Sequence, residues 1–304
     1  MNQAFLDTAR LLTQVAPVVF ESGLFALKGG TAINLFMREL PRLSVDLDLV
    51  LVDHSVPRDR ALGLINDAFK TAAARLEGRG LQTHMIAPPG LGETKLLVRS
   101  GAIEVKVEVN VVMRGTVHPV SDVALSETAS ELLMAELELP LVSLADAYGG
   151  KLVASLDRQH PRDLFDVIQL LQHEGITPDI RRSFVVYLAS HNRPVHEVLS
   201  PKLRDIQQDY EHTFVGMTRE PVALEELLGA REHVIRELVA SLDDAERKFL
   251  LSLVRNTPDW GLLGIEHLEA LPGIRWKLHN LERLAAKDTR RFTEQFELLE
   301  CLLA

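Results

Sequence analysis

The chain has 304 residues, of which 46% are hydrophobic, and a formal charge of −10. This size and hydrophobic content are enough for a buried core. The negative charge excludes binding of nucleic acid through bulk positive charge, so any nucleic-acid substrate would have to be held by a local basic patch. Asp7 and Arg10 interrupt the N-terminal apolar pattern, so we expect no signal peptide. No apolar window is long enough for a membrane span, and we expect a cytoplasmic location.

Helix and strand patterns alternate in the first half of the chain. Apolar spacing predicts helices over residues 2–20, 31–40 (closed by Pro41) and 57–76. A buried strand before Gly29, an alternating strand over residues 43–52, and strand-like runs at 81–86, 95–99 and 102–115 complete this region. After Pro140 the patterns are mostly helical, beginning with residues 143–159 and 161–175. We therefore expect an α/β domain over residues 1–140 and a mostly α-helical domain over 141–304.

Asp46 and Asp48 lie in the alternating strand "LSVDLDLVLV". Residues two apart on a strand share one face, about 7 Å apart, where two carboxylates repel each other. A divalent cation such as Mg²⁺, or Mn²⁺ in its place, would relieve that repulsion and complete its shell with substrate phosphates. Solvated acids on an exposed strand remain the alternative.

The turn Gly29-Gly30-Thr31 precedes the predicted helix over residues 31–40. Glycines there allow backbone N–H groups to approach an anion, and the helix N-terminus favours negative charge. Thr31 would either cap the helix or donate to a phosphate. One helix ahead of the paired acids, this turn is in a position to hold a nucleoside triphosphate.

A third carboxylate would bind a second metal ion or accept a proton from an attacking hydroxyl. The long strand "AIEVKVEVNVV" offers Glu108, which lies deeper in the apolar run than Glu104. A cross-strand ion pair is the competing role for Glu108.

Polar residues concentrate again in "YGGKLVASLDRQHPRDLFD", where two predicted helices meet. Pro161 suits the first position of the second helix, which puts Arg162 in its opening turn and Asp166 one turn later. Lys151 would suit a triphosphate as a point charge, whereas an ordinary pair on a solvated helix face explains the spacing equally well.

Together, "LKGGTAINLFMREL", "RLSVDLDLVL", "IEVKVEVNVVMRG" and "YGGKLVASLDRQHPRDLFDVIQL" resemble the AbiEii/AbiGii toxin family of nucleotidyltransferases, which includes the MenT-type toxins. The resemblance covers roughly residues 24–171. It implies an α+β fold, with a polymerase-β-like nucleotidyltransferase domain built on a mixed sheet and followed by a helical region. It also implies a toxin encoded beside its antitoxin in a type IV toxin–antitoxin or phage-defence system.

The same resemblance implies transfer of NMP from NTP, and some members modify the 3′ end of tRNA. By motif, Gly29, Gly30 and Thr31 match the phosphate-binding turn, and Asp46 and Asp48 match the metal-binding pair. Lys151 and Asp166 match the second catalytic block, which the helical domain would contribute to the active-site cleft. Ser44 matches a position that an antitoxin phosphorylates in some members. The candidate catalytic residues are Asp46, Asp48, Glu108, Lys151 and Asp166; the candidate nucleotide-binding residues are Lys28, Gly29, Gly30, Thr31, Ser44, Lys151 and Arg162.

Three other interpretations stay open at this point. In the first, the chain transfers NMP to a protein. In the second, it binds nucleotides without catalysis, as an interaction protein. In the third, it is a D-x-D glycosyltransferase, and the Gly29–Thr31 turn argues against this one.

Overall fold

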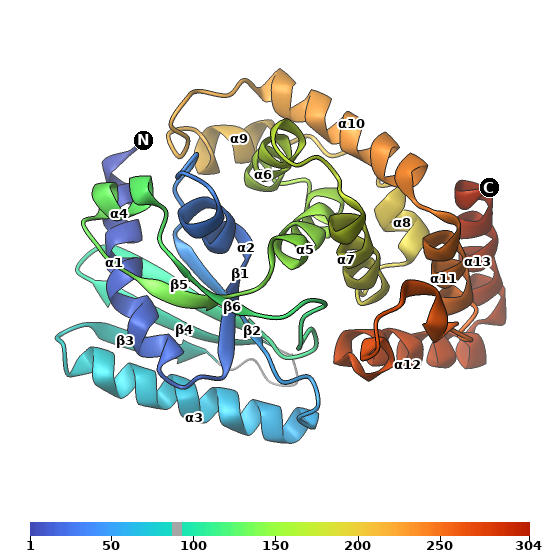
Figure 1. Ribbon diagram of the computed structural model, residues 1–304, viewed down its shortest axis with the longest axis horizontal. Coiled ribbons are helices and arrows are strands. Elements are labelled where there is room, and N and C mark those ends of the chain that lie inside the picture. The colour runs from blue at the N-terminus through green and yellow to red at the C-terminus, as the bar shows by residue number, and fades with distance from the viewer. Residues whose placement is uncertain (87–92) are drawn as a thin grey trace. The chain divides into compact units, whose positions relative to one another are not determined.

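The computed structural model describes residues 1–86 and 93–304, which form two compact units (Figure 1). The first unit contains residues 1–147 together with the later segment Val215–Pro221, and the second contains Tyr148–Phe214 and Val222–Ala304. The boundary lies within helix α5 (Leu144–Asp157). The predicted division of roles between residues 1–140 and 141–304 stays a prediction.

A seven-stranded mixed sheet forms the centre of the first unit, in the order β3-β4-β5-β2-β1-β7-β6. Its strands are β1 (Phe25–Lys28), β2 (Asp46–Leu51), β3 (Gln82–Ile86), β4 (Glu93–Ser100), β5 (Ile103–Asn110), β6 (Ser121–Ala124) and β7 (Glu138–Leu141). Strand β2 is parallel to β5 and antiparallel to β1. The predicted α+β class with a mixed sheet followed by helices is confirmed. Strands β6 and β7 were not predicted, because each has only four residues and β7 contains Pro140.

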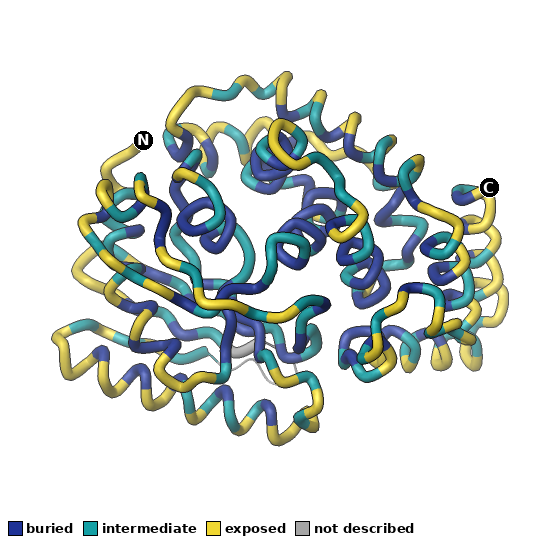
Figure 2. Tube along the Cα trace, viewed as in Figure 1, coloured by how far each residue is buried: buried dark blue, intermediate teal, exposed yellow. Residues whose placement is uncertain are grey.

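The two faces of this sheet differ in polarity. Helices α1 (Gln3–Phe20) and α3 (Arg58–Glu77) pack with the apolar side chains of Leu47, Leu49 and Val107 in one hydrophobic core. Buried and exposed residues alternate along α3 as one side of the helix meets this core (Figure 2). Because side chains alternate along a strand, Asp46 and Asp48 lie on the opposite face of the sheet.

The helix after β1 differs from the predicted one. Helix α2 (Gly29–Thr31) continues directly into a π-helix, η1 (Ala32–Met37), which ends before Pro41. Leu40 has a φ of +52°. Arg38 is already extended, with φ −130° and ψ 158°, so the helix ends three residues before the predicted end at Leu40. Helix α4 (Glu127–Leu133) follows β6 and was not predicted.

The second unit is helical, as predicted. After α5 it contains α6 (Pro161–Gln172), α7 (Pro178–Ala189), α8 (Val195–Leu199), α9 (Gln207–Thr213), α10 (Leu224–Ser241), α11 (Asp244–Val254), η2 (Trp260–Leu263), η3 (Leu268–Ala270), α12 (Pro272–Lys287) and α13 (Thr289–Leu303). Gly149 lets α5 approach α7 closely, since a Cβ there would lie 2.7 Å from Ser183 Cβ. This contact fixes the helix that carries Lys151.

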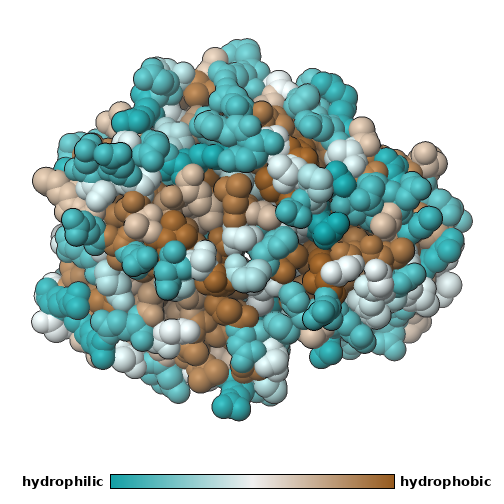
Figure 3. All heavy atoms as spheres, in the orientation of Figure 1, coloured by the Kyte–Doolittle hydropathy of each residue, from teal (hydrophilic) through white to brown (hydrophobic). Residues whose placement is uncertain are grey.

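The surface carries many charged side chains. Hydrophilic residues occupy much of the outline of the face drawn in Figure 3, as expected for a chain with 25% charged residues. Among the described helices, none is both long and apolar enough to span a bilayer. The cytoplasmic location stays a prediction.

Candidate active site

Charged residues form a row across the polar face of the sheet. In the strand register, Lys28 lies opposite Asp48, Asp48 opposite Glu108, and Glu108 opposite Lys95. The row therefore crosses β1, β2, β5 and β4. One step along the strands, Asp46 is the register partner of Lys106. The predicted strand is confirmed, and it presents both aspartates on one face. The structure therefore places Glu108 beside Asp48 through sheet register, which no sequence spacing shows.

The glycine turn lies directly against this row. Gly29 has a φ of +76°, and a Cβ at this position would lie 2.6 Å from Asp48 Oδ2. A Cβ at Gly30 would lie 2.5 Å from Arg42 Nη2. A Cβ at either position would collide with the end of a neighbouring side chain unless that side chain moved, and Gly29 also needs a conformation that L-residues rarely adopt. The turn and the first acids are thus brought together within one unit.

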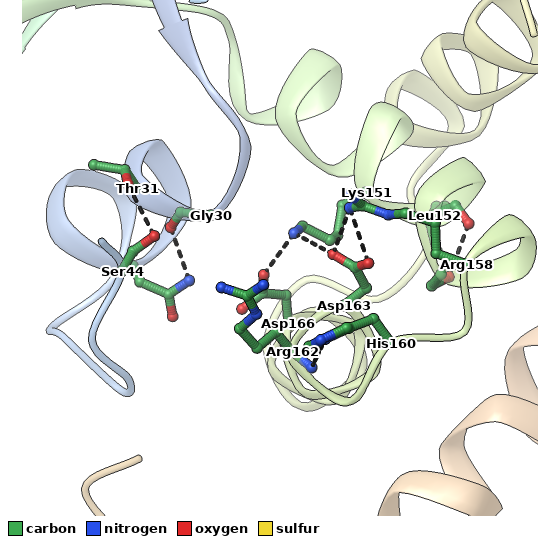
Figure 4. A network of polar contacts seen from close by, with 12 residues as sticks. Gly30, Thr31, Ser44, Lys151, Leu152, Arg158, His160, Arg162, Asp163 and Asp166 are labelled. Atoms are coloured by element: carbon green, nitrogen blue, oxygen red, sulfur yellow. Dashed lines mark hydrogen bonds and ion pairs between the residues drawn. The ribbon is translucent and has the colours of Figure 1, made fainter. Parts of the chain in front are cut away.

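Thr31 connects the turn to the start of β2. Its hydroxyl lies 2.8 Å from Ser44 Oγ (Figure 4). It also lies 2.5 Å from the carbonyl oxygen of Asp46. Thr31 and Ser44 are both buried. The Thr31 hydroxyl thus helps to position Asp46, and Ser44 contacts the same hydroxyl. The predicted contacts of Thr31 and Ser44 with nucleotide stay predictions.

Arg42 is part of this arrangement and was not among the predicted site residues. Its guanidinium is buried at the turn, and Nη1 donates to the carbonyl oxygen of Leu43 at 2.9 Å. The segment Val215–Pro221 holds the backbone here, since Arg42 forms an isolated bridge with Thr218. Arg42 stands inside the motif "RLSVDLDL". Strand periodicity indicates nothing about its role, because Arg42 precedes the strand.

Both carboxylate oxygens of Glu108 contact lysines. Lys95 Nζ lies 2.6 Å from Oε1, and Lys106 Nζ lies 3.1 Å from Oε2. Partial burial acts to raise the pKa of Glu108, but the two lysines outweigh it and the pKa lies below its ordinary value. The ionised form is therefore stabilised, and the carboxylate is a weak proton acceptor. The cross-strand ion pair considered as the alternative role is present.

The donors on this face suit Mg²⁺ in part. Among the described residues, no group of three or more His, Cys, Asp or Glu side chains is arranged to hold a metal ion. Asp46 and Asp48 are oxygen donors on one face, and Mg²⁺ in nucleotide sites is commonly held by one or two carboxylates plus substrate phosphates. This pair therefore fits Mg²⁺ or Mn²⁺. The metal-binding role of Glu108 stays a prediction, since its oxygens contact lysines.

In the second unit, the remaining candidates gather around Lys151. Its Nζ lies 2.8 Å from Asp163 Oδ1 and 2.9 Å from Asp166 Oδ2 (Figure 4). Burial acts to raise the pKa of Asp163, but Lys151 and Arg158 outweigh it, and the net pKa is lowered. Asp163 is thus held as an ionised partner of a buried lysine that Asp166 also contacts.

The start of α6 positions these aspartates. Pro161 takes the first helical position, as predicted, and the His160 side chain accepts a hydrogen bond from the Arg162 backbone N–H at 3.1 Å. Asp163 was not among the predicted site residues. Its position three residues before Asp166, on the same side of a helix, was the available signal.

Comparisons with known proteins place the fold and the sequence in a known group. In fold, the chain is similar to MenT4, a nucleotidyltransferase toxin from Mycobacterium tuberculosis H37Rv, with a TM-score of 0.58 and 19% sequence identity over 90% of this chain and 93% of that one. No curated protein sequence matches this one. Residues 10–280 match the family described as "Nucleotidyl transferase AbiEii toxin, Type IV TA system".

The fold and the family match define a nucleotidyltransferase. The chain belongs to the AbiEii family of nucleotidyltransferase toxins from type IV toxin–antitoxin systems. The resemblance found in the sequence motifs is confirmed. Membership in this family implies an NTP substrate and an antitoxin partner.

Proposed function

We propose that this protein transfers NMP from an NTP to an acceptor hydroxyl at the 3′ end of tRNA or another RNA, with Mg²⁺ as cofactor and a cognate antitoxin as its regulator. The observation that carries the proposal is the contact of the Gly29 turn with Asp48, beside Asp46 on the same sheet face. The acceptor is an inference from the family, and NMP transfer to protein is the second candidate.

The glycine turn and the two aspartates of the first unit have distinct tasks in this proposal. Backbone N–H groups of the Gly29–Thr31 turn would bind phosphate oxygens at a helix N-terminus. Asp46 and Asp48 would hold Mg²⁺, which when bound neutralises the triphosphate and favours its reaction. The acceptor hydroxyl releases its proton to solvent, and its oxygen bonds to the α-phosphorus. The bond from that phosphorus to the oxygen bridging the β-phosphate breaks, and pyrophosphate leaves. Thr31 maintains the position of Asp46 through its hydrogen bond to the Asp46 carbonyl.

We include Lys151, Arg162 and Asp166 in the proposed function because the family match extends over residues 10–280 and therefore covers both units. Lys151 is ion-paired with two aspartates. This arrangement supports a role in which the aspartates fix the position of the lysine. Ser44 is buried and accepts a hydrogen bond from Thr31, so its phosphorylation would require the side chain to become accessible. Mass spectrometry of protein co-expressed with the neighbouring gene product tests it.

The experiment is incubation of the purified protein with each α-³²P-NTP, Mg²⁺ and total tRNA, followed by a denaturing gel. We expect labelled tRNA with the wild-type protein and none with Asp46→Asn. Asp53→Asn is the matched control, because Asp53 is exposed beyond the end of β2 and should leave labelling unchanged. Label on protein in a cell lysate, with none on RNA, would support the second candidate. Labelling that persists in a folded Asp46→Asn variant would contradict the proposed role of the acid pair.

A further inference from the structure

Lys106 lies among the acids of the polar face and has no assigned role. Its Nζ is 3.1 Å from Glu108 Oε2 and 4.0 Å from Asp46 Oδ1. The sheet register places the Lys106 backbone opposite Asp46. The ammonium thus stands between the carboxylates of two neighbouring strands.

This is also where a second metal ion would need to bind. Two oxygens that share one Mg²⁺ ligate it at about 2.1 Å each, so they lie within roughly 4 Å of one another. A cation shared by Asp46 and Glu108 would therefore compete with the Lys106 ammonium for the same oxygens. Lys95 takes the other oxygen of Glu108, at 2.6 Å.

We propose that Lys106 supplies the positive charge that a second metal ion would bring, so that this protein works with a single divalent cation on Asp46 and Asp48. The inference rests on the proposed function, since it concerns the metal site of that reaction. Glu108 is then a positioning residue, which holds the Lys106 ammonium beside Asp46. A tethered cation compensates the acids permanently, whereas a second ion would have to be bound anew with each substrate.

The test is the number of Mn²⁺ ions bound per chain, measured by electron paramagnetic resonance during titration. The protein is first saturated with a non-hydrolysable α,β-methylene nucleoside triphosphate. Of the four analogues with the common bases, the one that binds most tightly is used. We expect one Mn²⁺ in the wild-type protein and two in Lys106→Met. Lys106→Arg keeps the charge and should bind one.

Arg99→Met is the matched control. Arg99 pairs with Glu104 across β4 and β5, away from the aspartates, so its loss should leave one Mn²⁺ bound. Two ions in the wild-type protein would overturn the proposal, and so would one ion in a folded Lys106→Met variant. A protein that binds one Mn²⁺ with the nucleotide but labels no RNA or protein would remove the proposed function and leave the ion count valid.

Discussion

Gly29 and Asp48 are in direct contact: the Gly29 Cα faces the Asp48 carboxylate so closely that a methyl group there would lie 2.6 Å from Oδ2. The contact joins the end of β1 to the middle of β2, which are antiparallel neighbours. It couples the proposed phosphate turn to the proposed metal pair, so a change in one must displace the other.

Gly29→Ala should therefore abolish NMP transfer. The added methyl group collides with Asp48, and the φ of +76° is strained for alanine. We expect a loss of stability of roughly 1 kcal/mol or more from the strain. The control is Gly63→Ala within α3, where nothing lies within 4 Å of the new methyl group. That change should stabilise the helix by up to about 1 kcal/mol and leave transfer intact. NMP transfer and denaturant unfolding are measured for both variants. Equal transfer by the two would contradict the coupling between the turn and Asp48.

Sequence patterns recovered much of the fold because they report on local preferences. The alternation around Asp46 predicted a strand, and Pro161 predicted the start of α6. They did not reveal the π-helix after Thr31, since apolar spacing does not distinguish a π-helix from an α-helix of the same length. Four-residue strands such as β6 carry too little alternation to detect.

In the candidate site, too, the sequence predicted residues that are close along the chain but not contacts between distant segments. Asp46 and Asp48 were found because they are two residues apart on one strand. The lysines on Glu108 come from sheet register and from a second strand, and the support of Arg42 comes from Thr218, far along the chain. These relationships depend on tertiary pairing, which one sequence does not display.

Thr31→Val tests the hydrogen bonds that hold the start of β2. The valine keeps the volume but removes the hydroxyl from Ser44 and from the Asp46 carbonyl. Leaving buried polar groups unsatisfied should cost about 1–3 kcal/mol of unfolding free energy, and displacement of Asp46 should lower transfer. Thr31→Ser keeps the hydroxyl and serves as control in urea unfolding and transfer assays. If both variants lose activity to the same degree, the hydroxyl is not what matters.

Asp163→Asn should be much more damaging than loss of its exposed partner. Asp163 is buried and pairs with Lys151, so neutralising it leaves an imperfectly compensated lysine. We expect a cost of about 3–5 kcal/mol. Arg158 is 63% exposed, and Arg158→Met should cost no more than about 1 kcal/mol. Denaturant unfolding of both variants measures the difference, and similar costs would show that Arg158 is the main partner of Asp163.

The same ion pairs affect how Lys151 can be tested. Because Lys151 lies between two buried aspartates, its removal would leave their charges uncompensated and should destabilise the second unit. Inactivity of Lys151→Ala therefore counts as a catalytic effect only at a temperature where circular dichroism shows the variant to be folded.

We expect the free energy of unfolding to rise at alkaline pH because of Lys277. Burial lowers its pKa from 10.5 to about 8, partly offset by Glu197, and its Nζ donates to the carbonyl oxygens of His191 and Arg193. Between pH 8 and 10.5 the folded chain has released this proton while the unfolded chain still holds it, so stability rises with pH there. The shift corresponds to about 3 kcal/mol at most. Urea unfolding at pH 7 and pH 10 should show this rise for the wild-type protein relative to Lys277→Met, in which other titrating groups are unchanged and cancel. Parallel pH profiles for the two proteins would mean that Lys277 keeps its proton in the folded state throughout this range.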